Sequence, residues 1–180
     1  RIKYKNLAKL EKADEVRTVM ISERYNPAET ATDNALNAYG TGIYNSSGTG
    51  LTGKGIVVSV LDTGLDYTHS AFQRLPDCAP ALSADMVEEL FPLLAASSLN
   101  GEGRWQSTYH STKVPYTFDY ADKDSDVYPV NDHGTHVAGI IAGKDDVITG
   151  VAIDAQLVIM KVFGNEDQGA EQEDILAGLS

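Results

Sequence analysis

The sequence contains almost no cysteine and no long apolar run. Cys78 is the single cysteine among 180 residues, which excludes a disulfide within the chain and a zinc site built from cysteines. No stretch approaches the roughly 20 apolar residues that a membrane-spanning helix needs, so we expect no such helix. An initial methionine and a signal peptide are also missing, and we expect both ends to be cuts in a longer protein.

Positive charge is scarce as well. The chain has 14 Lys and Arg against 26 Asp and Glu, a formal net charge of −12, and its sequence pI is about 4.6. An acidic surface repels phosphate backbones, so we expect no nucleic-acid partner. Hydrophobic residues make up 42% of the chain, which is enough for a packed core and argues against disorder.

Apolar strand-like runs alternate with helical segments. Residues 56–61 and 156–163 are short, apolar and rich in β-branched side chains, which is typical of strands covered on both faces of a parallel sheet. Residues 136–143 are small and apolar, which predicts a helix buried on every side. Further helices are expected at residues 4–12, 84–91 and 171–176, and a further strand at residues 16–22. This order predicts an α/β fold.

Asp62 directly follows the first of these strands, at the edge where open α/β sheets collect functional groups. A helix-capping or turn aspartate is the plainer interpretation of a single such residue. The triplet Asp62-Thr63-Gly64 also occurs in aspartic proteases, whose two carboxylates share a proton. The aspartic-protease pattern has a small residue at the position of Leu65. The triplet alone is therefore weak evidence for that class of enzyme.

His133 lies in the string Asn-Asp-His-Gly-Thr-His-Val-Ala-Gly of residues 131–139, where a predicted helix begins. The positive end of a helix dipole disfavours an imidazolium, and a general base must start neutral. A carboxylate beside the ring, such as Asp62 if the fold brings the two together, would hold its tautomer. The alternatives are a capping or core histidine, or a metal pair with His136, for which no third ligand is evident.

Three segments in order resemble the subtilase (peptidase S8) family of serine proteases. Residues 56–66 resemble the block with the catalytic Asp, residues 132–139 the block with the catalytic His, and residues 150–163 the segment that follows. The resemblance covers roughly residues 50–180. It implies a subtilisin-like three-layer α/β sandwich with a mainly parallel sheet, incomplete in this chain.

The resemblance also implies roles for individual residues. Asp62 would orient and stabilise the imidazole of His133, the general base of an Asp-His-Ser triad in a serine endopeptidase that hydrolyses proteins or peptides. Thr63 would hydrogen-bond the Asp62 carboxylate, His136 would be structural, and residues 169–170 would lie near the substrate cleft. No cofactor is expected for this chemistry.

The departures from the family are equally informative. The chain has no Gly-Thr-Ser-Met-Ala-type segment with the nucleophile and no oxyanion Asn, so we expect it to be inactive without the rest of its catalytic domain. The alternative is a catalytically inactive homologue that serves as a binding module. His133 follows Asp62 by 71 residues (133 − 62), which indicates an insertion at about residues 74–115.

This insertion gives the chain its likeness to the cell-envelope proteases of Gram-positive bacteria, the lactocepin and C5a-peptidase group. We therefore expect a secreted or cell-envelope location. Residues 1–30 resemble the C-terminal end of a propeptide with helix and strand, cut within residues 22–40, and residues 31–180 the start of the peptidase domain. Whether residues 1–30 instead belong to the mature domain is left open.

Calcium is the one metal that the sequence brings into question. Ala71 stands where the family has a calcium-ligand Asp, and the loop of residues 144–149 is short, so we expect the family's strong calcium site to be absent. The stretch 119–126 is rich in Asp and predicts a solvated surface loop. Its carboxylates could also bind a structural calcium, through the side chains of Asp122, Asp124 and Asp126.

Overall fold

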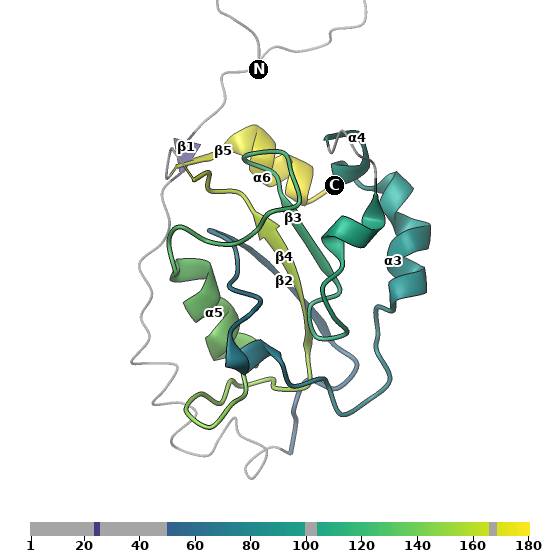
Figure 1. Ribbon diagram of the computed structural model, residues 1–180, viewed down its shortest axis with the longest axis vertical. Helices are drawn as coiled ribbons and strands as arrows, with labels where there is room; N and C mark the ends of the chain where they lie inside the picture. Colours follow the sequence, from purple (N-terminus) through teal and green to yellow (C-terminus); the bar gives the residue numbers. More distant parts are fainter. Residues whose placement is uncertain (1–23, 26–49, 100–103, 166–168) are drawn as a thin grey trace, which may run out of the picture.

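The structure is a computed structural model that describes residues 24–25, 50–99, 104–165 and 169–180 (Figure 1). The helix and strand predicted at residues 4–12 and 16–22 lie outside the described residues. Within the described ranges, no helix has the length and apolarity that crossing a bilayer requires.

In the described part of the chain, three parallel strands form the central sheet. β2 (Val57–Asp62) and β3 (Tyr116–Asp119) flank β4 (Gln156–Lys161), in the order β2-β4-β3. Asp62 and Asp119 are both in register with Lys161. The carboxyl ends of all three strands therefore meet at one edge of the sheet, where the predicted site begins.

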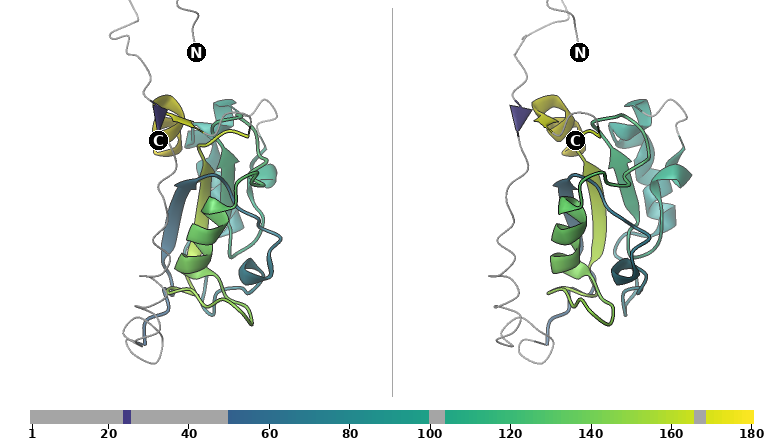
Figure 2. Two further views of the ribbon diagram at one scale, coloured as in Figure 1. Left: turned by 90° about the vertical axis from the view of Figure 1, so that its left-hand side faces the viewer. Right: turned by 60° about the vertical axis from the view of Figure 1, so that its left-hand side comes forward.

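Helices cover the two faces of the sheet, as Figure 2 shows. Leu157 and Ile159 of β4 belong to a core with α5 (His133–Ala142). Their neighbour Met160, which points the other way along the strand, belongs to a second core with α3 (Ala84–Leu90) and α4 (Ala96–Leu99). The predicted three-layer α/β sandwich with a parallel sheet is confirmed.

Two burial predictions are wrong. β2 was expected to be covered on both faces, but Ser59 is exposed and Val57 is 37% exposed. The reason is that β2 is an edge strand among the described residues, and α3 and α4 pack beside β3 on that face. α5 was expected to be buried on every side, yet it buries only its small-residue face against the sheet and leaves His136 exposed.

The remaining elements frame the sheet. The helices predicted at residues 84–91 and 171–176 are present as α3 and α6 (Gln172–Gly178). Ser83 caps the start of α3, because its hydroxyl accepts a hydrogen bond from Met86 N at 3.3 Å. β1 (Arg24–Tyr25) pairs antiparallel with β5 (Ala170–Glu171), just before α6. Short 3-10 turns occupy Ser70–Phe72, Phe91–Leu93 and Trp105–Thr108.

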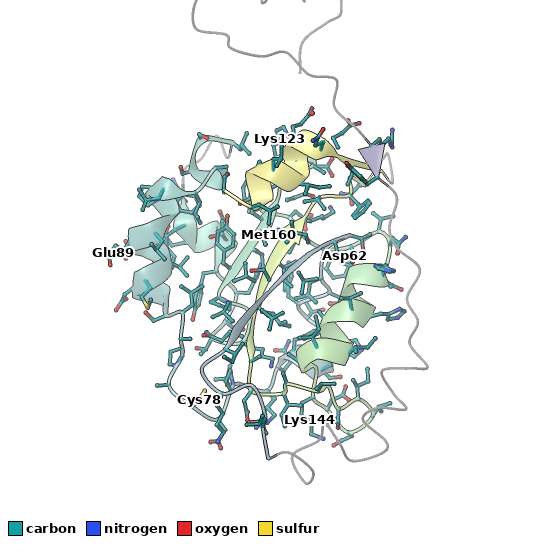
Figure 3. All side chains as sticks on the ribbon, turned by 180° about the vertical axis from the view of Figure 1, so that it is seen from behind. Asp62, Cys78, Glu89, Lys123, Lys144 and Met160 are labelled. Carbon is teal, nitrogen blue, oxygen red and sulfur yellow. The ribbon has the colours of Figure 1, made fainter. Side chains whose placement is uncertain are left out.

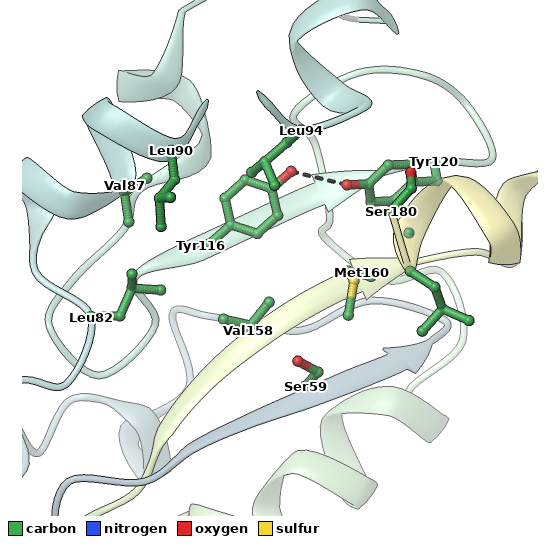
Figure 4. Close-up of a pocket in the computed structure, with 12 residues that line it drawn as sticks. Ser59, Leu82, Val87, Leu90, Leu94, Tyr116, Tyr120, Val158, Met160 and Ser180 are labelled. Carbon is green, nitrogen blue, oxygen red and sulfur yellow. Dashed lines mark hydrogen bonds between the residues drawn. The ribbon is translucent and has the colours of Figure 1, made fainter. Parts of the chain in front are cut away.

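One apolar pocket opens on the sheet face opposite α5 (Figure 4). Its volume is about 290 Å³, and Val158 and Met160 form its floor between α3 and the end of α6. The hydroxyl groups of Tyr116 and Tyr120 lie 3.1 Å apart at its rim and share a hydrogen bond. This pocket lies over a part of the sheet that the described helices leave uncovered.

Candidate active site

Asp62 is the last residue of β2 and is almost wholly buried, with 8% of its surface exposed. Its Oδ1 accepts a hydrogen bond from the backbone N–H of Thr63 at 2.7 Å. Figure 3 shows the residue at the sheet edge, beside the first turn of α5. A carboxylate held in this way has a fixed orientation and is poorly solvated, as the orienting group of a catalytic dyad must be.

His133 is the first residue of α5, and the fold brings it against Asp62. Its Nδ1 lies 2.8 Å from Asp62 Oδ1 and 2.9 Å from Oδ2, so the proton of the neutral ring resides on Nδ1 and is donated to the carboxylate. The lone pair is then on Nε2, which is buried and receives no hydrogen bond from the described residues. The imidazole is therefore oriented to accept a proton at Nε2.

Thr63 joins the loops that carry the two residues. Its hydroxyl donates to the carbonyl of Asn131 at 2.7 Å and accepts from Gly134 N at 2.9 Å. The expected hydrogen bond to Asp62 is made by the backbone N–H of Thr63, because its hydroxyl is engaged with the loop before α5. Asn131 Oδ1 also accepts from His133 N at 2.9 Å, which secures the start of the helix.

Two glycines allow this close approach. Gly64 has a φ of +110°, a conformation that side chains rarely permit, and a Cβ there would collide with the carbonyl of Val127. A Cβ on Gly134 would collide with the carbonyl of Gly64. Glycine at position 134 therefore lets the turn after β2 touch the first turn of α5, and glycine at position 64 lets the same turn lie against the backbone of Val127.

A buried charged cluster beneath this turn was missed by the sequence analysis. We call it the Lys161 cluster: Lys161 Nζ lies 2.6 Å from Asp119 Oδ2 and donates to Asn165 Oδ1 at 2.8 Å. Asn165 N in turn donates to Asp122 Oδ2 at 3.2 Å. Burial raises the pKa of Asp119 to about 6, although a hydrogen bond from Asp122 N and the ammonium of Lys161 both favour the ionised form.

The Lys161 cluster corrects the surface-loop prediction for residues 119–126 at its start, whereas Asp122, Lys123, Asp124 and Asp126 are exposed in a loop as predicted. Asp119 is fully buried and ends β3, a strand that was not predicted. The aliphatic stem of Lys161 packs beneath Gly64, because a Cβ on that glycine would lie 3.1 Å from Lys161 Cδ. The cluster therefore supports the turn that carries Asp62. The alternating aromatic and β-branched residues of 116–118 were the signal for β3.

The other predicted residues lie apart from this pair. The side chain of His136 has no hydrogen bond to any described residue. Ala170 is buried in β5 beside its bridge partner Phe163.

The described residues hold no group of three or more His, Cys, Asp or Glu side chains placed to bind a metal ion. The metal pair of His133 and His136 has no third ligand among them. Asp124 and Asp126, which were considered for calcium, use one carboxylate oxygen each to accept the backbone N–H two residues ahead, at 2.8 and 2.9 Å.

Comparison with known proteins identifies one family. The model of the subtilase family (Peptidase_S8) matches residues 53–180, a range that contains Asp62 and His133. The likeness predicted from the sequence is thus confirmed.

Three relatives illustrate the range of similar proteins. A PII-type proteinase of Lacticaseibacillus paracasei is 34% identical over 179 residues, which is 94% of this chain and 9% of the relative. C5a peptidase of Streptococcus pyogenes serotype M3 is 33% identical over 117 residues, 61% of this chain and 9% of its own length. The major intracellular serine protease of Bacillus subtilis is 32% identical over 133 residues, which is 73% of this chain and 31% of the relative. The chain thus spans less than a third of each relative.

Proposed function

This chain belongs to the subtilase family, and we propose that it supplies the Asp and His of a serine endopeptidase whose nucleophilic Ser lies further along the same protein. The observation that supports this proposal best is the hydrogen-bonded pair of Asp62 and His133, with an imidazole Nε2 that carries a lone pair. The roles of both residues follow from that pair.

The reaction would proceed through a covalent intermediate. Nε2 of His133 takes the proton of the Ser hydroxyl while the Ser oxygen attacks the carbonyl carbon of a peptide bond. Asp62 stabilises the imidazolium that forms, and the imidazolium then protonates the departing amine. Water, deprotonated by the same imidazole, releases the acyl group and restores the enzyme. No cofactor is required for these steps.

The test uses the complete enzyme and a chromogenic peptide amide near neutral pH. A serine-directed phosphonate should block hydrolysis, whereas a pepstatin-type inhibitor should not. His133→Ala should lower kcat by a factor on the order of 10⁶, as in a subtilisin. The matched control is His69→Asn, an exposed residue whose Nδ1 accepts from Ala71 N at 3.2 Å, an acceptor that Asn retains. Near-normal turnover of His133→Ala would refute the mechanism.

The alternative, an inactive homologue that only binds, predicts a different result. The wild-type complete protein would then hydrolyse no peptide and would not react with the phosphonate. The presence of both Asp62 and His133 in hydrogen-bonding contact favours the enzyme.

We also infer that residues 1–30 are the end of a propeptide and residues 31–180 the start of the peptidase domain, with an insertion at about residues 74–115. The antiparallel pairing of β1 with β5 supports this division, since an extended segment lies along a sheet edge as a bound peptide would. Sequencing the N-terminus of the processed enzyme tests it. A first residue within 22–40 is expected, and a mature chain that begins upstream of residue 22 would contradict it.

A secreted or cell-envelope location is proposed on the same likeness to the C5a-peptidase group. The relative from Bacillus subtilis is intracellular by its name, so family membership alone does not decide the compartment. Fractionation of the producing cells, followed by an activity assay of each fraction, decides the compartment. Recovery of the enzyme only from the cytoplasm would contradict the proposal.

A further inference from the structure

Lys161 contacts the segment that carries Asp62 through its strand and through its side chain. The two residues are in register, and the next amide of β4, Val162 N, donates to the carbonyl of Asp62 at 3.0 Å (Figure 1). Partners in register project from the same face of a sheet. The stem of Lys161 accordingly runs beneath the turn after Asp62, where a Cβ on Gly64 would lie 3.1 Å from Lys161 Cδ.

The same turn touches the start of α5. A Cβ on Gly134 would collide with the carbonyl of Gly64 and would lie 3.2 Å from Asp62 Cβ. Gly134 directly follows His133 in the first turn of the helix. The stem of Lys161, Gly64 and Gly134 therefore form one continuous series of contacts that ends beside the imidazole. A displacement of the stem would be passed along this series to His133.

The ammonium group of Lys161 is held by two other segments. Asp119 Oδ2, at the end of β3, lies 2.6 Å from Nζ, and Asn165 Oδ1, in the loop after β4, accepts from Nζ at 2.8 Å. Asp122 Oδ2 lies 3.8 Å from the same nitrogen. Because the side chain is only 1% exposed, the ammonium would lose these partners without gaining water if the stem changed its rotamer. The stem is therefore fixed at both ends.

Stability alone does not account for a lysine at this position. A buried ion pair must offset the desolvation of both charges, and apolar side chains of similar volume often give equal or greater stability. Hydrogen bonds, however, have a directional geometry that apolar contacts lack, so they hold a flexible stem in one position. Catalysis depends on such precision, because a displacement of about 1 Å can lower the rate on the order of 10²-fold.

We propose that Lys161 is a positioning residue of the peptidase: its anchored side chain fixes Gly64 and, through Gly64 and Gly134, the imidazole of His133. The proposal rests on the proposed peptidase function and adds a buried residue to it. A purely structural lysine would change only the amount of folded enzyme. A positioning lysine changes the rate at each folded site.

The double variant Lys161→Met/Asp119→Asn separates these two roles. It removes both charges together, so neither is left alone in the core, but the stem loses its anchored end. A fluorescent serine-directed phosphonate is added to the complete enzyme at saturating concentration. The final amount of label counts the folded sites. The first-order rate constant reports the competence of each site, because the Ser oxygen displaces the leaving group from phosphorus while His133 accepts the Ser proton.

The rate constant of the double variant should be about 10- to 100-fold below that of the wild type, the upper value being that of a displacement of about 1 Å. With a peptide amide, kcat should fall by the same factor while KM changes little. Asn165→Ala replaces an exposed residue and keeps the ion pair, so it tests the proposal even if the double variant does not fold. Its rate constant should be about two- to tenfold lower, the range of one hydrogen bond.

Lys123→Met is the matched control. It removes an ammonium from another buried aspartate, Asp174, at 2.8 Å, and can therefore lower the amount of label, but it should leave the rate constant unchanged. An unchanged rate constant in the folded Lys161 and Asn165 variants would overturn the proposal, and so would an equal decrease in Lys123→Met.

Failure of the proposed function is recognised separately. If the wild-type enzyme is not labelled at all, hydrogen exchange measured by mass spectrometry tests the positioning by itself. Peptides that cover residues 62–66 and 131–136 should exchange about tenfold faster in the double variant, because this part of the structure opens more often, whereas peptides of α3 should exchange as in the wild type. Equal exchange of residues 62–66 and 131–136 in both proteins would refute the role of Lys161.

Discussion

Replacement of Lys161 by methionine would leave the carboxylate of Asp119 alone in the core. Both side chains are 1% exposed, and their charged atoms are 2.6 Å apart. Removal of one partner from such a buried pair typically costs about 3–5 kcal/mol, because the other charge stays desolvated without compensation. At about 2–4 °C per kcal/mol for a domain of 150–250 residues, Tm should fall by about 6–20 °C.

The decrease in Tm caused by Lys161→Met should depend on pH. Since burial raises the folded-state pKa of Asp119 to about 6, this carboxyl contributes most stability below about pH 4, the ordinary pKa of Asp, and loses that contribution as the pH rises through about 6. Without Lys161 the folded-state pKa of Asp119 rises further, so the loss of stability with rising pH continues to higher pH. The Tm deficit of Lys161→Met should therefore be larger at pH 8 than at pH 5.

Differential scanning calorimetry of the complete enzyme, inactivated beforehand with the phosphonate to prevent autolysis, measures both effects. The double variant Lys161→Met/Asp119→Asn should recover most of the loss at pH 8, because asparagine is neutral and still offers an oxygen to Asp122 N, which now donates at 2.8 Å. Lys54→Met breaks an exposed ion pair with Asp77 and should leave Tm unchanged. Equal deficits at pH 5 and pH 8 would refute the reasoning.

Two further predictions concern the catalytic dyad itself. Asp62→Asn should lower kcat by a factor on the order of 10⁴ while KM changes little, because the imidazole loses its tautomer and its counter-charge but the cleft is untouched; steady-state kinetics that show a loss mainly in KM would contradict this role. Thr63→Val removes the hydroxyl between Asn131 and Gly134 and leaves a buried N–H without its partner, which should cost about 1–3 kcal/mol. Calorimetry measures that loss, for which Thr63→Ser, with the hydroxyl restored, is the control.

The elements that the sequence predicted are those with a strong local pattern. β4 and α5 follow apolar runs, and α6 begins where acidic residues suit the helix dipole. β3 was missed because it spans only four residues and ends in the Asp-rich stretch that reads as a loop. The sequence does not predict which face of each strand is exposed. Exposure depends on the order of the strands in the sheet, and that order depends on pairings between segments far apart in the chain.

For the candidate site, the pair of Asp62 and His133 could be predicted from the sequence, but the Lys161 cluster beneath it could not. Asp62 and His133 lie in strings whose composition is unusual enough to mark them. Asp119 looks like any surface aspartate until Lys161, 42 residues later (161 − 119), is found beside it in the sheet. The contact of Arg24 with Gly169 was equally hidden, because only the pairing of β1 with β5 brings these two residues together.

The strand order β2-β4-β3 has a consequence for the time at which the dyad can assemble. β2 pairs with β4 and has no ladder with β3, and the ends of β2 and β4 are 99 residues apart in the chain (161 − 62). At about 5–20 residues per second, a ribosome needs about 5–20 s to synthesise that stretch. Until that stretch is complete, Asp62 lacks the neighbouring strand that orders it. A newly made chain therefore passes through a period in which Asp62 is not yet held in place to orient the imidazole of His133.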